Sequence, residues 1–259
     1  MNILFYGNCQ MTGLKYFFDR SPDREKFSTR ALQDFQITLG EVTRPKVKED
    51  LAWADTIVYH TKGMLFPNGD EMPPKPDSWL IPASVFYNGG YFMSCAEEQD
   101  WLPVLAYAQR YGQVNALRYG VHEADLGYWR RRLANIERMR LKEEEEGIAA
   151  AHRISDLIYR GTEEKQHITM NHPTSIVFVE WADRLLKYLG LEGVTDQQRE
   201  EARCHDNLVR LPCEDFVSDG ARKHLGLKWG GSDYENQMCE GIVAKWLRDH
   251  ALSAEYAMG

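Results

Sequence analysis

The chain has 259 residues, of which 43% are hydrophobic and 27% charged, a composition that excludes a disordered or collagen-like protein. Its 31 basic and 39 acidic residues give a net charge of −8, which argues against nucleic acid as a main partner. The five cysteines are irregularly spaced, unlike the disulfide framework of a secreted protein. We find no targeting segment and no apolar run of the ~18 residues that a membrane span needs, so we expect a cytoplasmic protein.

The beginning of the chain predicts an α/β unit. Residues 3–6 form a short apolar run typical of a buried parallel strand, and Gly7 ends it. Apolar residues at three- and four-residue spacing then predict a helix over residues 11–18. We expect a second strand at residues 35–39 and, after an acidic helix, a third at residues 56–59. Strand, helix and strand in this order favour a parallel sheet with right-handed crossovers.

The rest of the chain predicts mainly helices. Clustered prolines indicate a surface loop over residues 63–78, and residues 79–87 predict one more strand. Helices are expected over residues 97–110, 128–146, 148–159, 173–189 and 233–251. We therefore expect one domain over residues 1–259. In it, an α/β portion over about residues 1–95, SGNH- or Rossmann-like at its start, is integrated with a predominantly helical portion over about residues 96–259.

The tetrapeptide Gly7-Asn8-Cys9-Gln10 lies between the first strand and the first helix, which places Cys9 at a helix N-terminus. There, free backbone N–H groups and the helix dipole stabilise a thiolate or a bound anion, and they would stabilise an oxyanion too. Gly7 permits a tight turn, and Asn8 tolerates unusual backbone angles while it offers a side-chain amide. The alternative is a small buried cysteine in a strand-to-helix turn, since free cysteine is often buried.

Asn171-His172-Pro173 is the second candidate motif. We expect a short strand at residues 167–170, followed by His172 at the cap of a helix that begins with Pro173. From that position the ring can act as a general base toward Cys9, because such partners are distant in sequence and adjacent in space. The alternative is that Asn171 and His172 only cap the helix, as asparagine commonly does.

Further residues lie where a ligand site would form. His60 is expected at the carboxyl end of the third strand, where α/β folds bind ligands, and Asn88 would offer an amide donor in a loop at the same edge. The basic residues concentrate in one stretch, which suits a phosphorylated ligand: Arg118, Arg130, Arg131 and Arg132. For these arginines the alternative is a solvated helix face.

Some site classes are excluded by spacing. The Cys204-His205 pair and Cys213 are too irregular for a structural zinc site, so we expect no metal. No Gly-x-Gly-x-x-Gly follows the first strand, and no glycine-rich loop ends in Lys-Ser or Lys-Thr. Their absence argues against an enzyme that uses a dinucleotide or a nucleoside triphosphate.

The combination of motifs resembles the WcbI family. Its members are polysaccharide-biosynthesis proteins regarded as acetyltransferases that bind coenzyme A or acetyl-CoA, with a mostly helical fold around a small α/β portion. The family usually has glutamine where this chain has His60. The landmarks that carry the resemblance are Gly7-Asn8-Cys9-Gln10, the strand from Ala54 to Tyr59, the stretch from Ile81 to Tyr91, and Asn171-His172-Pro173-Thr174.

The resemblance implies transfer of an acyl group, expected to be acetyl from acetyl-CoA, to a hydroxyl of a sugar or glycan precursor. In one version Cys9 is the nucleophile, His172 takes its proton, and Asn8, Gln10 or Asn88 stabilises the oxyanion. In another, Cys9 only lines the thioester site and His172 deprotonates the sugar hydroxyl. Two alternatives stay open: an SGNH-like esterase or deacetylase with Cys9 in the serine position, and a non-catalytic protein that binds a glycan or nucleotide-sugar.

Overall fold

The structure is a computed structural model. It describes residues 1–60, 80–84, 121–149, 152–158, 163–169 and 172–206, with shorter stretches between 208 and 238, and for residues 121–132 it describes the backbone alone. The chain divides into two units, and we call the first the sheet unit: Met1–Phe86, Glu137–Tyr159 and His172–Arg210. The second unit comprises Tyr87–Ile136, Arg160–Asn171 and Leu211–Gly259. The expectation of a single domain stays a prediction.

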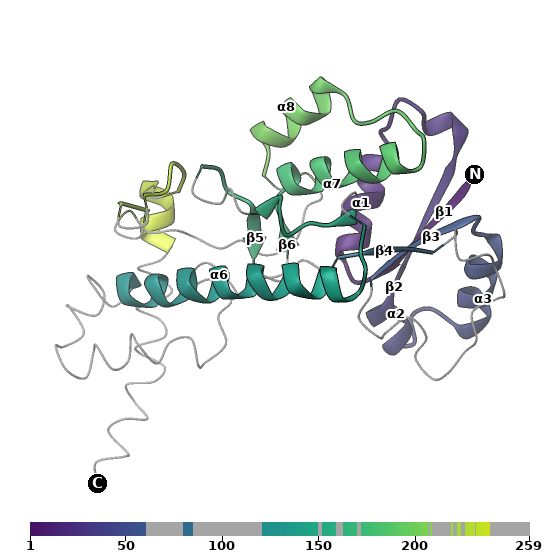
Figure 1. The fold of residues 1–259 in the computed structure, drawn as a ribbon, viewed down its shortest axis with the longest axis horizontal. Helices are drawn as coiled ribbons and strands as arrows, with labels where there is room; N and C mark the ends of the chain where they lie inside the picture. Colours follow the sequence, from purple (N-terminus) through teal and green to yellow (C-terminus); the bar gives the residue numbers. More distant parts are fainter. Residues whose placement is uncertain are drawn as a thin grey trace, which may run out of the picture. The chain divides into compact units, whose positions relative to one another are not determined.

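A four-stranded parallel sheet organises the sheet unit (Figure 1). Its order is β2-β1-β3-β4, and the strands are β1 (Asn2–Gly7), β2 (Ser28–Gln33), β3 (Thr56–His60) and β4 (Leu80–Ala83). β1 is central and buried from its second residue onward, as expected of a parallel strand covered on both faces. The predicted fold class, an α/β portion with a small parallel sheet and a mainly helical remainder, is confirmed.

The connections reverse the strand order at β1. α1 (Gln10–Phe18) leads from β1 to β2, while α2 (Asp34–Thr38) and α3 (Arg44–Trp53) lead from β2 back to β3, on the other side of β1. In open α/β sheets, ligands bind at such a switch point, outside the carboxyl ends of the strands. The topology therefore points to the residues that follow β1 and β3.

Packing on both faces fixes the end of β1. Its side chains alternate between the faces, and Phe5 meets Phe18 of α1 edge to face, with ring centroids 4.9 Å apart. On the other face, Leu4 and Tyr6 join a buried cluster with Leu32, Val47, Leu51, Ala54 and Ile57. Burying one large apolar side chain contributes about 1.5–3 kcal/mol, so two packed layers hold the strand in place.

α7 (Ser175–Tyr188) packs on α1 through a close approach at Gly13. A Cβ atom at Gly13 would lie 2.4 Å from the ring of Phe178, so only glycine allows this approach. α7 follows the short strand β6 (His172–Pro173) after a single residue. The helix packing therefore determines where His172 lies relative to the start of α1.

α8 (Asp196–Cys204) and its preceding turn hold α7 in place. The Asp183 carboxylate accepts a hydrogen bond from the backbone N–H of Val194 at 3.0 Å and pairs with Arg199 at 3.0 Å and Lys187 at 2.7 Å. Burial raises the pKa of Asp183, but the hydrogen bonds from Lys187 and Arg199 lower it overall. The carboxylate is thus charged at neutral pH and ties the two helices together.

α6 (Val121–Glu145) is confirmed as a helix, but the helix predicted over residues 148–159 is wrong. The described residues 152–158 form turns instead. The reason is a buried carboxylate: Glu143 accepts hydrogen bonds from the backbone N–H groups of Ile154 at 2.9 Å and Ser155 at 3.2 Å. These N–H groups therefore need no helical carbonyl partner.

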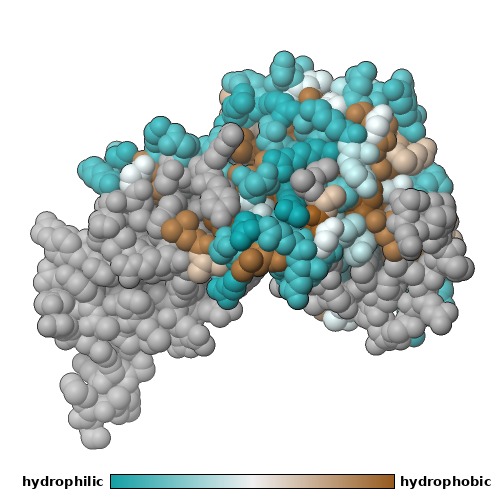
Figure 2. Space-filling view, viewed as in Figure 1, coloured by the Kyte–Doolittle hydropathy of each residue, from teal (hydrophilic) through white to brown (hydrophobic). Residues whose placement is uncertain are grey.

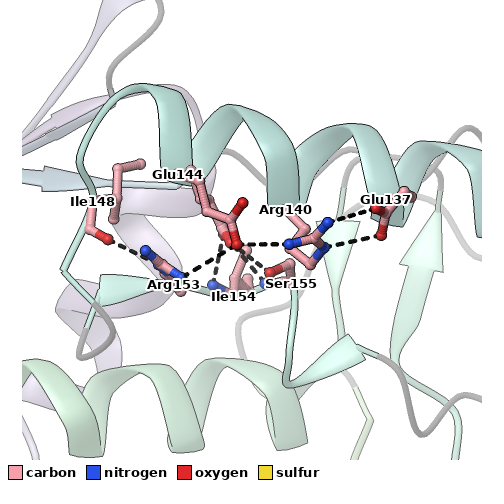
Figure 3. A network of polar contacts seen from close by, with 8 residues as sticks. Glu137, Arg140, Glu144, Ile148, Arg153, Ile154 and Ser155 are labelled. Atoms are coloured by element: carbon pink, nitrogen blue, oxygen red, sulfur yellow. Dashed lines mark hydrogen bonds and ion pairs between the residues drawn. The ribbon is translucent and has the colours of Figure 1, made fainter.

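Partly exposed charged residues near Glu143 extend this network (Figure 3). Arg140 donates to Glu137 and to Glu144, in both cases at 2.6 Å. Arg153 donates to the carbonyl of Ile148 at 2.8 Å. The segment after α6 is thus ordered by side-chain contacts with its backbone.

The second predicted strand is displaced. β2 occupies Ser28–Gln33, and most of the predicted strand at residues 35–39 lies in the short helix α2. Phe35 and Leu39 are 43% and 68% exposed, so this apolar run does not mark a buried strand. β2 is an edge strand with several half-exposed positions, and its mixed polar sequence gives only a weak strand signal.

The strands β1 and β3 and the helices α1 and α3 are confirmed, as is α7, although α7 begins at Ser175. Pro173 belongs to β6, so the expectation that it opens a helix is wrong. The predicted short strand appears as β5 (His167–Thr169), and residues 80–83 form β4 within the predicted 79–87. The predicted loop at 63–78 and helix at 97–110 lie outside the described residues, as does much of the last helix, of which 233–238 is helical.

Hydrophilic residues cover most of the described surface on the face shown in Figure 2, and hydrophobic residues form smaller patches among them. Among the described helices, none combines the length and apolar character that a membrane crossing requires. α6 is long enough at 25 residues, but charged residues recur along it.

Candidate active site

The turn after β1 is built around Gly7 and His60. Gly7 has a φ of +155°, and a Cβ atom there would lie 2.6 Å from Nδ1 of His60. The backbone N–H of Asn8 donates a hydrogen bond to the same Nδ1 at 3.3 Å. His60, the buried last residue of β3, therefore accepts at Nδ1, which assigns the ring proton to Nε2 and makes the ring neutral.

Asn8 precedes the N-cap of α1 and stabilises the turn into the helix. Its Oδ1 atom accepts the backbone N–H of Gln10 at 2.9 Å, and its carbonyl accepts the N–H of Met11 at 3.1 Å. In the part of the chain that the structure describes, no hydrogen bond occupies the side-chain NH₂ group of the half-buried Asn8. Gln10 is buried in the first turn of α1. Asn8 thus keeps one amide donor available beside Cys9.

Cys9 and His172 lie in direct contact. Cys9 occupies the N-cap position of α1, and its Sγ atom is 3.1 Å from Nε2 of His172 in β6. Both side chains are half-buried. The two motifs are 163 positions apart in sequence, and the packing of α7 on α1 brings them together. A thiol and an imidazole at this distance can exchange a proton.

Burial favours the neutral form of both partners. It is the main cause that raises the pKa of Cys9, and the charge of Asp34 adds to it, while the backbone N–H groups of Cys9 and Gln10 lower the pKa in part. Burial also lowers the pKa of His172. The helix start does stabilise a thiolate as expected, but burial outweighs it. Both shifts favour a neutral thiol beside a neutral imidazole, an arrangement in which the Cys9 S–H can donate to Nε2 of His172.

Asp34 is a charged neighbour that the sequence analysis missed. Gly7 pairs with Gln33 in the register of β1 and β2, so Asp34 leaves the sheet at the same edge as Asn8. Together with burial, its charge raises the pKa of Tyr6 to about 12. The misplaced second strand hid this residue, because a strand at 35–39 puts Asp34 at the opposite end of the sheet.

Several predicted site residues are not placed by the structure. Asn88, Arg118 and Asn171 lie outside the described residues, while Arg130 and Arg131 lie in α6 with only their backbone described. Within the described ranges, no group of three or more His, Cys, Asp or Glu side chains is arranged to hold a metal ion. Among the described residues, the candidate site comprises Gly7, Asn8, Cys9, Gln10, His60 and His172, with Asp34 beside them.

Fold and site together define an α/β protein with a Cys–His pair at the switch point of a small parallel sheet. No protein-family profile and no curated protein matches the chain. A solved structure of WcbI, described as a novel polysaccharide biosynthesis enzyme, does match: it covers 96% of this chain and 94% of its own, with 14% sequence identity and a TM-score of 0.53. That structure is the native WcbI without a disulfide bond between coenzyme A and one of its cysteines. At this identity the match shows a WcbI-like fold.

Proposed function

We propose that this protein is an acyltransferase that passes an acetyl group from acetyl-CoA to a hydroxyl of a sugar or glycan precursor in the cytoplasm. The contact of 3.1 Å between Cys9 Sγ and His172 Nε2 carries this proposal, because it joins a nucleophile to a base at the switch point. The WcbI-like fold supports it, since the solved WcbI is called a polysaccharide biosynthesis enzyme and described in relation to coenzyme A.

The first half-reaction transfers the acetyl group to Cys9. His172 Nε2 takes the proton of the Cys9 thiol as Sγ attacks the thioester carbonyl. The new C–S bond forms, the bond to the sulfur of coenzyme A breaks, and His172 returns the proton to the leaving thiolate. Because burial favours the neutral form of both groups, we expect proton transfer to accompany the attack. Such general-base assistance contributes about 10²–10⁴ in rate.

The developing oxyanion needs donors close to Cys9. The side-chain NH₂ of Asn8 is one candidate, and the backbone N–H groups that lower the pKa of Cys9 are others. We assign Asn88 and Asn171 as further amide donors, from their sequence positions. Losing one such donor costs about 10²–10³ in kcat.

The second half-reaction releases the product. The acceptor hydroxyl attacks the acetyl carbon on Cys9, His172 takes the hydroxyl proton, and the Cys9 thiolate leaves and regains that proton. An ester and the free thiol result. For the phosphates of coenzyme A we propose Arg118, Arg130 and Arg131, because guanidinium groups bind phosphate in a bidentate manner. Alanine variants of these residues are expected to raise the KM for acetyl-CoA and leave kcat similar.

Three measurements test the proposed function. Coenzyme A and acetyl-CoA are expected to raise the melting temperature of the protein, and absence of any shift would remove the donor. Cys9→Ala and Cys9→Ser are expected to abolish transfer, whereas transfer by these variants would show that His172 deprotonates the acceptor directly. Cys204→Ser is the matched control, because Cys204 is an exposed cysteine at the end of α8. Acetate release at equal rates with and without a sugar would indicate a hydrolase.

A further inference from the structure

The segment after β2 lies beside Cys9 and has no role in the donor half-reaction. The parallel register pairs Gly7 with Gln33, so Asn8-Cys9 and Asp34-Phe35 leave the sheet side by side at its carboxyl edge. Asp34 is half-buried, whereas the ring of Phe35 is 43% exposed. The charge of Asp34 acts on the Cys9 thiol, and the exposed ring of Phe35 belongs to the next residue of the same segment.

The Asp34 carboxylate retains hydrogen-bonding capacity. Its Oδ1 atom accepts the backbone N–H of Phe35 at 2.7 Å. In the ranges that the structure describes, the carboxylate makes no other hydrogen bond and no ion pair neutralises it. A carboxylate has about four acceptor positions, so it can receive further donors from a ligand.

The charge of Asp34 opposes one half of the proposed reaction and suits the other. Attack by Cys9 builds negative charge on sulfur and oxygen, which a neighbouring carboxylate disfavours; its charge already raises the pKa of the Cys9 thiol. In the second half, by contrast, a hydroxyl approaches the acetylated Cys9 and must lose a proton. A carboxylate accepts hydrogen bonds from hydroxyl groups, and these bonds are the stronger because the acceptor is charged.

We propose that Asp34 and Phe35 form the acceptor subsite: the Asp34 carboxylate receives hydroxyl groups of a sugar, and the Phe35 ring packs against the apolar face of the same sugar. This inference rests on the proposed function, since it supplies the acceptor side of that site. It assigns the substrate to polyhydroxylated molecules and the specificity to the segment after β2.

The first test measures the alkylation of Cys9 by iodoacetamide as a function of pH, followed on the Cys9 peptide by mass spectrometry. The titratable groups at Cys9 are His172 and Asp34, with His60 linked through Asn8. In Asp34→Asn the midpoint of the alkylation rate against pH is expected to move to lower pH, because the loss of a negative charge lowers the pKa of the Cys9 thiol. Asp34→Glu is expected to restore it, and Glu41→Gln, which changes an exposed carboxylate, to leave it unchanged. The same midpoint in Asp34→Asn and wild type would overturn the inference.

The second test measures how methyl glycosides of glucose, galactose, mannose and N-acetylglucosamine protect Cys9 from iodoacetamide. Protection is expected in the wild type, with a half-protecting concentration about tenfold higher in Asp34→Asn and several-fold higher in Phe35→Ala, as for a lost charged hydrogen bond. Glu41→Gln should behave as the wild type. Absent protection in the wild type, or equal protection in Asp34→Asn, would overturn the subsite.

If acetyl-CoA is not the donor, the outcome differs from the one expected if the acceptor subsite is wrong. If acetyl-CoA neither shifts melting nor acetylates the protein while glycoside protection follows the expected order, the subsite stands and the acetyl-CoA proposal is rejected. Since misfolding also speeds alkylation, each variant is compared with wild type by thermal melting. The Asp34→Glu variant separates charge from folding, because it retains the carboxylate.

Discussion

Nδ1 of His60 accepts the backbone N–H of Asn8 at 3.3 Å, so the last residue of β3 holds the turn that presents Cys9. The two segments are 52 positions apart in sequence. Cys9 is thus positioned by the neighbouring strand of the sheet as well as by its own helix, and the contact requires a neutral ring.

Replacing His60 tests this contact. His60→Leu removes the acceptor and leaves a part-buried N–H without a partner, a cost of about 1–3 kcal/mol in the free energy of unfolding. We expect kcat to fall about 10–100-fold as the Cys9–His172 geometry loosens, since small misplacements are costly in rate, with little change in the KM for acetyl-CoA. His60→Gln offers an amide oxygen and should retain most activity. Equal losses in both variants would contradict a role for the hydrogen bond.

Gly7→Ala is expected to disrupt the same turn. The substitution combines an unfavourable φ with a Cβ atom 2.6 Å from the His60 ring, so we expect a loss of roughly 1–3 kcal/mol or more in the free energy of unfolding and loss of transfer. Gly40→Ala is the matched control. Gly40 also has a positive φ, +75°, but a Cβ atom there meets nothing within 4 Å. A Gly7→Ala variant as active and stable as Gly40→Ala would refute the account of the turn.

The neutral Cys9–His172 pair predicts a particular pH dependence. Because burial lowers the pKa of His172, its ring stays neutral and able to act as a base below pH ~6.5, the usual value for histidine. The acid limb of kcat/KM should therefore have its midpoint below pH ~6.5. Because the pKa of Cys9 is raised, the ultraviolet absorbance of its thiolate, at about 240 nm, should be absent at pH ~7. Thiolate absorbance that disappears in His172→Ala would instead show a preformed ion pair.

His152 predicts an acid-sensitive contribution to stability. His152 is 2% exposed, and its ring packs edge to face with Tyr188, with the ring centroids 4.2 Å apart. Burial lowers its pKa, and the Pro82 carbonyl opposes this only in part. Between the lowered folded pKa and ~6.5, the unfolded chain binds more protons than the folded one, so the free energy of unfolding falls as pH falls through this window.

Chemical denaturation between about pH 5 and pH 8 measures this contribution, since the window lies around the ordinary histidine value. His152→Phe keeps the buried ring and cannot be protonated, so its free energy of unfolding should fall less than that of the wild type on acidification. His205→Gln, at an exposed position, serves as the control. An identical pH dependence of the free energy of unfolding in wild type and His152→Phe would show that the pKa of His152 does not change on unfolding.

The parts of the fold predicted from sequence are those with local signals. β1, α1 and β3 follow from apolar runs and helical spacing, and Gly7 and Asn8 mark the turn between the first two. β2 escaped prediction because its place in the sheet depends on pairing with β1, while its own residues are half-exposed. That error also hid Asp34.

The sequence predicts that Cys9 and His172 belong to the candidate site, but it does not predict the protonation states of their side chains. Cys9 and His172 are recognisable from the elements expected around them, although His172 lies in β6 and not at a helix cap. The balance between the helix N-terminus and burial at Cys9 depends on packing from α7 and on Asp34 across the strand pair. Sequence spacing carries no information on this packing or on the neighbourhood of Asp34 and Cys9.

The central claim is that Cys9, activated by His172, accepts the acetyl group. Rapid mixing with acetyl-CoA, acid quenching and mass spectrometry of the peptides test it most directly. One acetyl group is expected on the Cys9 peptide in the wild type and in Cys204→Ser, formed about 10²–10⁴ times more slowly in His172→Ala. An unmodified Cys9 peptide during turnover, or an unchanged rate in His172→Ala, would contradict it.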